Sequence, residues 1–353
     1  MAKYEIDRRD FLNSLLFVGG AGLLLPFGCS GLPGKNKDSF FSIAQKNGRW
    51  WLVTPQGDYI FSIGLNHIDP ASLRYLSSNS IWEEKYGNSM KEWLPKVKAD
   101  LSDWGFNCLG WDQEVVIIQP KMHRHSRSFT FEEYQWLDMP YFHLLPFIES
   151  HQWEWETRLP DIKSEAFAEW CDYVARDRCA RFRDDPKLVG YFFTDCPAWI
   201  HSSEGNSWKA PIFDPEMEKS ESGRKEIFDT ATIYYKTIVD AIRRYDPNHL
   251  ICGDRYEANA PISEEVLKAA LPYVDIFSFQ CFGTVENISE KMSYWAQYLK
   301  RPILLADSMI NKEGNMAGHL SMTGHRMRKP MEKSCTPYAR FLSAWDFIFV
   351  VPI

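Results

Sequence analysis

The stretch that decides the fold is LVGYFFTD, residues 188–195, in which an apolar run ends in Thr194 and Asp195. Apolar residues at helical spacing precede it over 164–183 and follow it over 225–245. A short apolar run is typical of a strand that is buried on both faces, and the flanking segments are long enough for helices. A buried strand between two helices is the repeating unit of a parallel sheet with helical crossovers.

The same alternation continues in both directions along the chain. Further helices are predicted over 90–104, 263–271 and 287–299. Further strands are predicted over 61–65, 106–111, 139–145, 250–253, 276–279 and 303–306, after a hairpin over 48–61 that turns at 55–58. Seven strands of this kind favour an α/β fold of the (β/α)8 TIM-barrel type over a doubly wound sheet, because no glycine-rich phosphate loop follows any of them.

The eighth strand has to begin near residues 347–353, where the sequence ends in the apolar run FIFVVPI. The expectation is a TIM barrel truncated before or within its eighth strand, or one that is closed in an unusual manner. An open barrel would leave the edges of its first and seventh strands unpaired.

Composition excludes several classes of protein. The chain has 353 residues, of which 45% are hydrophobic and 25% are charged, and this balance excludes intrinsic disorder. The net charge is −7, with 40 basic and 47 acidic residues, so the basic surplus of a nucleic-acid-binding protein is absent. Aromatic residues make up 15% of the chain, and a surplus of flat rings is typical of clefts that bind sugars.

The amino-terminal segment has the pattern of a targeting signal. Arg8 and Arg9 precede Phe11 and an apolar run over 15–27, which is too short to span a membrane comfortably. This pattern resembles a twin-arginine export signal, and Cys29 lies in a sequence that resembles a lipoprotein processing site. We expect residues 1–34 to be an export signal recognised by the twin-arginine machinery, with a lipid anchor at Cys29 as one outcome. Residues 35–353 would then form a catalytic domain in the periplasm or at the cell surface.

The cysteines predict neither a metal site nor a disulfide. No Cys-x-x-Cys motif occurs, and Cys171 and Cys179 are too far apart for a disulfide on the predicted helix, at roughly 12 Å. We expect no metal and no cofactor. A different reading rests on His123 and His125, because paired histidines occur in metal-dependent barrel hydrolases.

Polar residues follow the predicted strands directly. In barrels the active site lies at the carboxyl ends of the strands, so these residues should share one rim. Asp195 and Asp307 follow the fourth and seventh strands, and cleavage of a glycosidic bond needs two such carboxyl groups. The candidates for contacts with substrate are Asn66, His67, Trp111, Asp112, Thr194, Trp199, Arg255, Tyr256 and Gln280.

The segments around the two aspartates resemble known sequences. Residues 190–195 resemble the strand-four segment of clan-A glycoside hydrolases, and residues 302–307 resemble their strand-seven segment. Residues 50–66 look like the first-strand region of agarase-like members. The resemblance implies that Asp195 is the acid/base and Asp307 the nucleophile, while Thr194 replaces an asparagine that contacts the sugar 2-hydroxyl. It also implies a polysaccharide or oligosaccharide substrate, with agar-type galactan as the leading expectation.

Both acids are aspartates where the clan has glutamates, and each is one methylene shorter. Retaining enzymes hold their carboxyl groups about 5–5.5 Å apart and inverting enzymes about 6.5–9.5 Å apart. The shorter side chains widen the gap unless the backbone moves inward, so both stereochemical outcomes stay open. Endo and exo action stay open too, as does a carbohydrate-binding protein without catalysis.

Several site residues have a second interpretation. Arg255 either contacts the ligand or forms an ion pair with a rim carboxylate, and Asp307 would also suit a helix N-cap. Asn66 and His67 either contact sugar or hold the rim by hydrogen bonds. The aromatic candidates Trp111, Trp199 and Tyr256 either stack on sugar faces or pack within the barrel.

Overall fold

The structure is a computed structural model. It describes residues 39–74, 79–110, 115–119, 122–125, 127–148, 150–151, 156–157, 161–195, 197, 215–308 and 347–351. Residues 1–38 lie outside the described residues, and with them the predicted export signal and Cys29.

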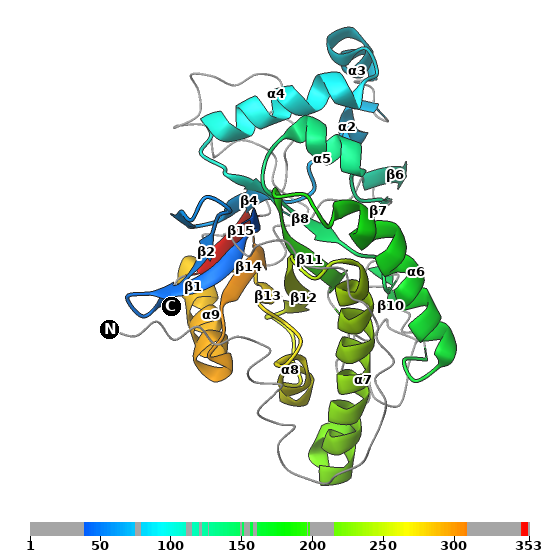
Figure 1. Ribbon diagram of the computed structural model, residues 1–353, viewed down its shortest axis with the longest axis vertical. Coiled ribbons are helices and arrows are strands. Elements are labelled where there is room, and N and C mark those ends of the chain that lie inside the picture. The colour runs from blue at the N-terminus through cyan, green and yellow to red at the C-terminus, as the bar shows by residue number, and fades with distance from the viewer. Residues whose placement is uncertain are drawn as a thin grey trace. The chain divides into compact units, whose positions relative to one another are not determined.

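A closed eight-stranded barrel forms the centre of the fold (Figure 1). The strands in chain order are β4 (Ile63–Leu65), β5 (Cys108–Leu109), β8 (Tyr141–Leu144), β11 (Leu188–Asp195), β12 (Leu250–Glu257), β13 (Phe277–Gln280), β14 (Ile303–Asp307) and β15 (Phe347–Val351). Every pairing from β4 through β14 is parallel. The predicted (β/α)8 barrel is therefore confirmed, and all seven predicted strands are present.

The eighth strand closes the barrel in an unusual way. β15 lies between β14 and β4 and runs antiparallel to both, with Leu305 opposite Phe349 and Gly64 opposite Ile348. Its sequence is rich in aromatic and β-branched residues, which suits a strand between two buried neighbours. An antiparallel strand pairs its backbone groups as completely as a parallel one, so both neighbouring edges are covered.

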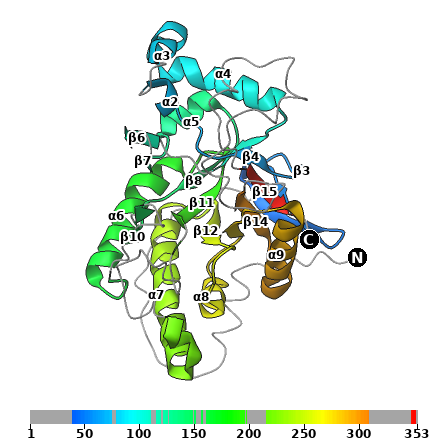
Figure 2. The same cartoon turned by 180° about the vertical axis from the view of Figure 1, so that it is seen from behind.

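Helices connect the strands and cover the outside of the barrel. In chain order they are α2 (Ala71–Arg74), α3 (Asn79–Tyr86), α4 (Met90–Asp103), α5 (Phe131–Leu137), α6 (Glu165–Phe182), α7 (Glu221–Tyr245), α8 (Glu264–Ala270) and α9 (Val285–Leu299), with a 3₁₀ turn at Pro215–Lys219. Both ribbon views show α6 and α7 side by side (Figures 1 and 2). Ser164 and Ser220 cap the first turns of these two helices with their hydroxyl groups.

A small antiparallel sheet closes the amino-terminal end of the barrel. It consists of β1 (Ser42–Lys46), β2 (Arg49–Val53) and β3 (Tyr59–Ile60), and its second and third strands form the predicted hairpin. Phe41 and Leu52 pack into the cluster that fills the barrel interior. The ring of Phe40 lies 4.9 Å from that of His249, just before β12 begins. This arrangement leaves the carboxyl ends of the strands for a site.

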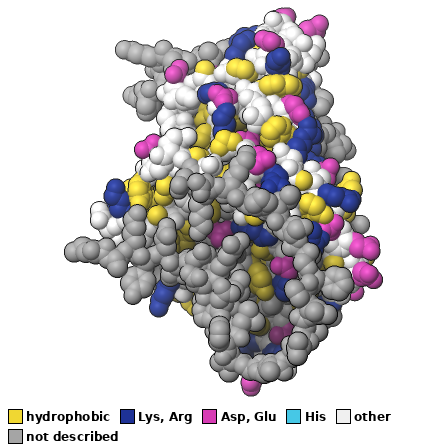
Figure 3. Space-filling model, viewed as in Figure 1, with side chains coloured by type: hydrophobic (Ala, Val, Ile, Leu, Met, Phe, Trp, Pro, Cys, Tyr) yellow, Lys and Arg dark blue, Asp and Glu magenta, His cyan; other side chains and the backbone are white. Residues whose placement is uncertain are grey.

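Two further short hairpins lie outside the barrel. One pairs β6 (Val115–Gln119) with β7 (Met122–His125), and the other pairs β9 (Ser150–His151) with β10 (Glu156–Thr157). Among the described residues, no helix is long and apolar enough to cross a membrane. Figure 3 shows acidic and basic side chains intermixed over the described part of one face.

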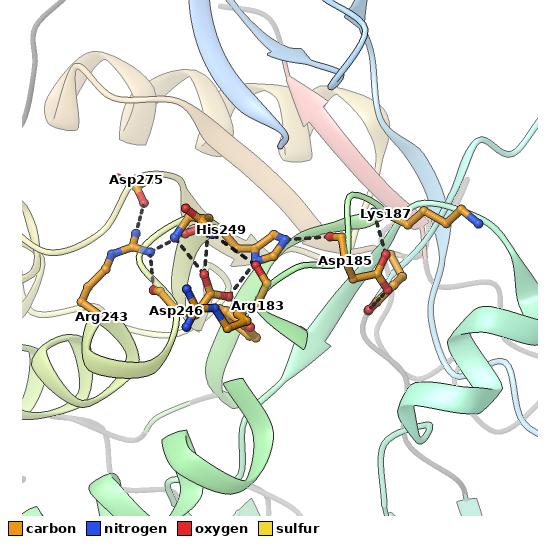
Figure 4. Close-up of polar contacts among 10 residues, drawn as sticks. Arg183, Asp185, Lys187, Arg243, Asp246, His249 and Asp275 are labelled. Carbon is orange, nitrogen blue, oxygen red and sulfur yellow. Dashed lines mark hydrogen bonds and ion pairs between the residues drawn. The ribbon is translucent and has the colours of Figure 1, made fainter. Parts of the chain in front are cut away.

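A buried polar network joins the amino-terminal ends of β11 and β12 (Figure 4). His249 Nδ1 lies 2.6 Å from Asp246 Oδ2, and both side chains are fully buried. His249 Nε2 lies 2.8 Å from the carbonyl oxygen of Asp185, which precedes β11. Arg243 donates hydrogen bonds to the carbonyl oxygen of His249 and to Asp275, at 2.6 and 3.2 Å. Because the network lies at the strand starts, it fixes the strands without taking part in the rim.

Candidate active site

Buried polar side chains gather at the carboxyl ends of the barrel strands. Most protein interiors avoid such groups unless each has a partner, so their concentration at one rim indicates a functional site. The residues at this position that are at most 5% exposed include Asn66, Arg255, Glu257, Gln280 and Asp307.

A β-bulge decides which side chains of β12 face this rim. The register between β11 and β12 slips by one residue between Ile251 and Gly253, and Gly253 has a φ of +65°. Cys252 packs into the barrel interior, so regular alternation would turn Asp254 inward and Arg255 outward. The bulge reverses this order, because a bulge inserts one extra residue and re-aims the side chains after it. The predicted strand over 250–253 is thus too short, since β12 continues four residues past the glycine to its end.

The central contact of the rim joins Arg255 to Asp307. Arg255 Nη1 lies 3.0 Å from Asp307 Oδ2, and the two side chains are 4% and 7% exposed. Arg255 is also opposite Asp195 in the pairing of β12 with β11. One arginine therefore links the ends of the fourth, fifth and seventh strands, and the ion-pair alternative for Arg255 is confirmed.

Asn66 holds the first strand against the seventh. Its side-chain amide donates a hydrogen bond of 2.8 Å to the carbonyl oxygen of Ala306, the residue before Asp307. The next residue, His67, has a φ of +52°, which is an uncommon backbone conformation for a residue with a side chain. The hydrogen-bonding alternative for Asn66 is thus observed, while a sugar contact by Asn66 or His67 stays a prediction.

Glu257 is a rim carboxylate that is missing from the predicted site. Its Oε2 accepts a hydrogen bond from Gln280 Nε2 at 2.6 Å, and its Oε1 accepts one from the backbone N–H of Asn259, also at 2.6 Å. The signal in the sequence is the alternation Arg-Tyr-Glu at 255–257, which places Arg255 and Glu257 on one face of a strand. Gln280 is thereby part of the rim, in contact with an acid.

A second polar network lies behind the rim, between the barrel and α7. Asp254 accepts hydrogen bonds from the hydroxyl groups of Tyr234 and Tyr235, at 2.8 and 2.6 Å. Burial raises the pKa of both tyrosines well above the ordinary value, and the charge of Asp254 raises it further. The Tyr256 hydroxyl lies 2.5 Å from that of Tyr235, and the Thr194 hydroxyl lies 3.0 Å from that of Tyr234. The predicted contacts of Thr194 and Tyr256 with sugar stay predictions.

The remaining predicted site residues differ in whether the structure describes them. Asp195 ends β11 at the rim, and its backbone position is described. Trp111, Asp112 and Trp199 lie outside the described residues. No cluster of three metal-ligating side chains occurs within the described part of the chain. The described cysteines, namely Cys108, Cys171, Cys179, Cys252 and Cys281, are buried free thiols.

Parallel strands with helical crossovers and a polar carboxyl rim define a protein of the (β/α)8-barrel class. Solved structures with the same fold include two agarases, so the expected agarase-like barrel is confirmed at the level of the fold. The agarase AgWH50C matches with a TM-score of 0.56 and 18% identity over 86% of this chain and 56% of its own. An exo-beta-agarase matches with a TM-score of 0.55 and 15% identity over 84% of this chain and 56% of its own.

A third structure, PfGH50B, matches with a TM-score of 0.55 and 16% identity over 77% of this chain and 53% of its own. The chain thus spans slightly more than half the length of these three structures. Comparisons with protein-family models and with curated proteins found no match.

Proposed function

We propose that this protein is an exported glycoside hydrolase that cleaves a polysaccharide or its oligosaccharides, with agar-type galactan as the leading substrate. One observation carries the proposal. Asp195 and Asp307 end the fourth and seventh strands of an agarase-like barrel, and Arg255 connects their positions through a backbone pairing with Asp195 and an ion pair with Asp307.

The roles of the two acids follow from the chemistry of the bond. The glycosidic bond breaks between the anomeric carbon and the bridging oxygen, and Asp195 donates a proton to that oxygen as it leaves. Asp307 stays ionised beside the Arg255 guanidinium, because an adjacent positive charge favours the charged form of a carboxyl group. Asp307 then either attacks the anomeric carbon directly or takes a proton from the attacking water.

A second candidate, a carbohydrate-binding protein without catalysis, is favoured by the same ion pair. Asp307 is buried against Arg255, whose guanidinium group offsets its charge within the protein, so the contact also suits a barrel whose rim only binds. A buried carboxylate whose charge is neutralised within the protein has a structural role as well as a chemical one.

Release of reducing sugar from agar, porphyran, carrageenan and plant β-glycans separates the two candidates. The expected result is release from a galactan that disappears in Asp307→Asn and in Asp195→Asn, with circular dichroism showing that both variants fold. A folded wild-type protein that retains affinity for a galactan but releases no sugar would replace the hydrolase with the binding protein.

The export part of the proposal rests on the amino-terminal sequence. Replacing Arg8 and Arg9 together by lysine should retain the full chain in the cytoplasm, since the twin-arginine machinery reads the two arginines. Cys29→Ala should release the exported protein from the membrane fraction if Cys29 carries a lipid. Unchanged localisation in the two variants would contradict the export signal and the anchor respectively.

A further inference from the structure

The pairing between β11 and β12 is irregular just before it reaches the site. Asp195 pairs with Arg255, but the register shifts between this pair and the one before it, so two residues of β11 lie opposite one residue of β12. The two are Phe193 and Thr194, and the one is Asp254. Because a bulge locally disrupts the hydrogen-bond ladder, the backbone positions of Asp195 and Arg255 depend on contacts beyond a regular ladder.

One side chain of α7 joins the two strands across this bulge. The Tyr234 hydroxyl group donates to Asp254 Oδ1 at 2.8 Å, and its oxygen lies 3.0 Å from Thr194 Oγ1. A tyrosine hydroxyl has a single proton, which Asp254 receives here, so Thr194 is the donor in the second bond. The bridge therefore ends on Thr194 and Asp254, which directly precede Asp195 and Arg255 in the chain.

Tyr234 and Asp254 are themselves fixed in place. Both side chains are fully buried. The ring of Tyr234 stacks on that of Phe167 in α6, with the centroids 6.2 Å and the planes 12° apart, and it makes an edge-on contact with the ring of Tyr235. Asp254 accepts a second hydrogen bond, from the Tyr235 hydroxyl group at 2.6 Å. A side chain held by packing and by buried hydrogen bonds can fix the groups that it contacts.

We propose that Tyr234 is a positioning residue of the active site, which sets the positions of Asp195 and Arg255 from outside the barrel. The proposal rests on the proposed function, because it assigns Asp195 to the reaction. A reacting group has to lie within about 0.5 Å of its productive position, and a misplacement of about 1 Å can lower a rate by about 100-fold. Loss of the Tyr234 hydroxyl group should therefore lower kcat and leave KM nearly unchanged.

The test measures reducing-sugar release by the full chain from agar and from porphyran. Tyr234→Phe should lower kcat about tenfold and change KM by less than about twofold. Tyr191→Phe is the matched control, because Tyr191 is also fully buried and donates to Asp246 Oδ2 at 2.7 Å, at the amino-terminal end of β11. Urea unfolding should show that both variants lose stability, whereas only Tyr234→Phe should lose kcat.

Thr194→Val distinguishes the bridge from a direct contact between Thr194 and sugar. It breaks the same hydrogen bond, so it should lower kcat to a similar extent, and Thr194→Ser should recover most of that loss. Because the bridge is already broken in Tyr234→Phe, the double variant with Thr194→Val should stay near the same tenfold loss. Independent contributions of the two residues would instead multiply to a loss of about 100-fold.

Equal kcat values in Tyr234→Phe and Tyr191→Phe, or multiplied losses in the double variant, would overturn the positioning role while hydrolysis by the wild-type protein stands. If Tyr234→Phe does not fold, Thr194→Val carries the test, and a wild-type kcat in that variant would also overturn the role. A folded wild-type protein that releases no reducing sugar from either galactan would overturn the proposed function, and the positioning role with it.

Discussion

The side chain of Asn66 donates a hydrogen bond of 2.8 Å to the carbonyl oxygen of Ala306, a residue 240 positions further along the chain. Asn66 follows β4 and Ala306 is in β14, and in the barrel these two strands are separated by β15. The hydrogen bond therefore spans the closing strand at the rim. Because Asp307 follows Ala306 directly, the position of the proposed nucleophile depends on Asn66.

Asn66→Ala should reduce both stability and turnover. It leaves the buried carbonyl oxygen of Ala306 without this donor, which costs about 1–3 kcal/mol in the free energy of unfolding measured with urea. Asn107→Ala is the matched control, since Asn107 donates to the carbonyl oxygen of Phe61 and accepts from the N–H of Ile63 at the start of β4. Both variants should be destabilised, but only Asn66→Ala should lower kcat under conditions in which both proteins are folded.

Arg255→Met should destabilise the protein strongly. Removing one partner of a buried ion pair leaves Asp307 as a buried charge and costs about 3–5 kcal/mol in the free energy of unfolding. Arg244→Met removes an exposed ion pair with Asp172, in which the arginine side chain is 59% exposed, and should cost less than about 1 kcal/mol. Equal effects of the two substitutions would show that the Arg255–Asp307 contact is no stronger than a surface ion pair.

Acid should weaken the network at the amino-terminal end of the barrel. Burial by itself would raise the pKa of Asp246, but the hydrogen bonds and charge of His249, with hydrogen bonds from Tyr191 and the Asn248 N–H, lower it overall. A carboxyl group with a lowered pKa in the folded state contributes stability above its unfolded pKa of about 3.9 and loses that contribution as the pH falls through the folded value.

Asp246→Asn should therefore be less stable than the wild-type protein at pH 7, and the difference should shrink as the pH falls below about 4. Urea unfolding of both proteins at a series of pH values measures this difference. A difference that stays the same between neutral and acidic pH would contradict the lowered pKa of Asp246.

Gly253→Ala should disturb β12 at its bulge. Gly253 has a φ of +65°, and an added Cβ would lie 2.9 Å from Cγ2 of Val274, so both the backbone and the neighbour oppose the substitution. We expect a loss of about 1–3 kcal/mol. Gly57→Ala is the control, because Gly57 has a φ of +88° with nothing within 4 Å of the added carbon. A larger loss in Gly57→Ala would contradict the crowding at Gly253.

Most of the barrel could be predicted because its elements are encoded locally. The helix predicted over 90–104 is α4, which ends one residue earlier, and the strand predicted over 303–306 is β14, which ends one residue later. The helix predicted from residue 225 begins at Glu221 instead, because Ser220 caps an additional turn. Such differences concern ends, where capping contacts rather than periodicity decide the boundary.

The features that could not be predicted depend on pairing between distant segments. The direction of β15 is set by β14 and β4, and nothing in the run FIFVVPI distinguishes a parallel from an antiparallel strand. β1 has a mixed sequence, SIAQK, and is a strand because β2 pairs with it. Composition alone does not report such partners.

The location of the site could be predicted, but the residues that form it could be predicted only in part. Arg255 could be placed at a strand end, but only the fold could show that it binds Asp307. Glu257 was left out of the predicted site because the predicted strand stops at Gly253, and a strand that stops there has no alternation to place a residue four positions further along the chain.

The bulge at Gly253 divides β12 into two short segments in which opposite sets of alternate residues face the barrel interior. In its first half, even-numbered residues such as Cys252 face the barrel interior, and in its second half the odd-numbered Arg255 and Glu257 take that side. A one-residue insertion or deletion at this joint would exchange the two sets and bring Asp254 and Tyr256 to the rim. The side chains in the first half of β12, which pack in the barrel interior, would keep their orientation. The orientation of the rim side chains and that of the core side chains are therefore set independently within one strand.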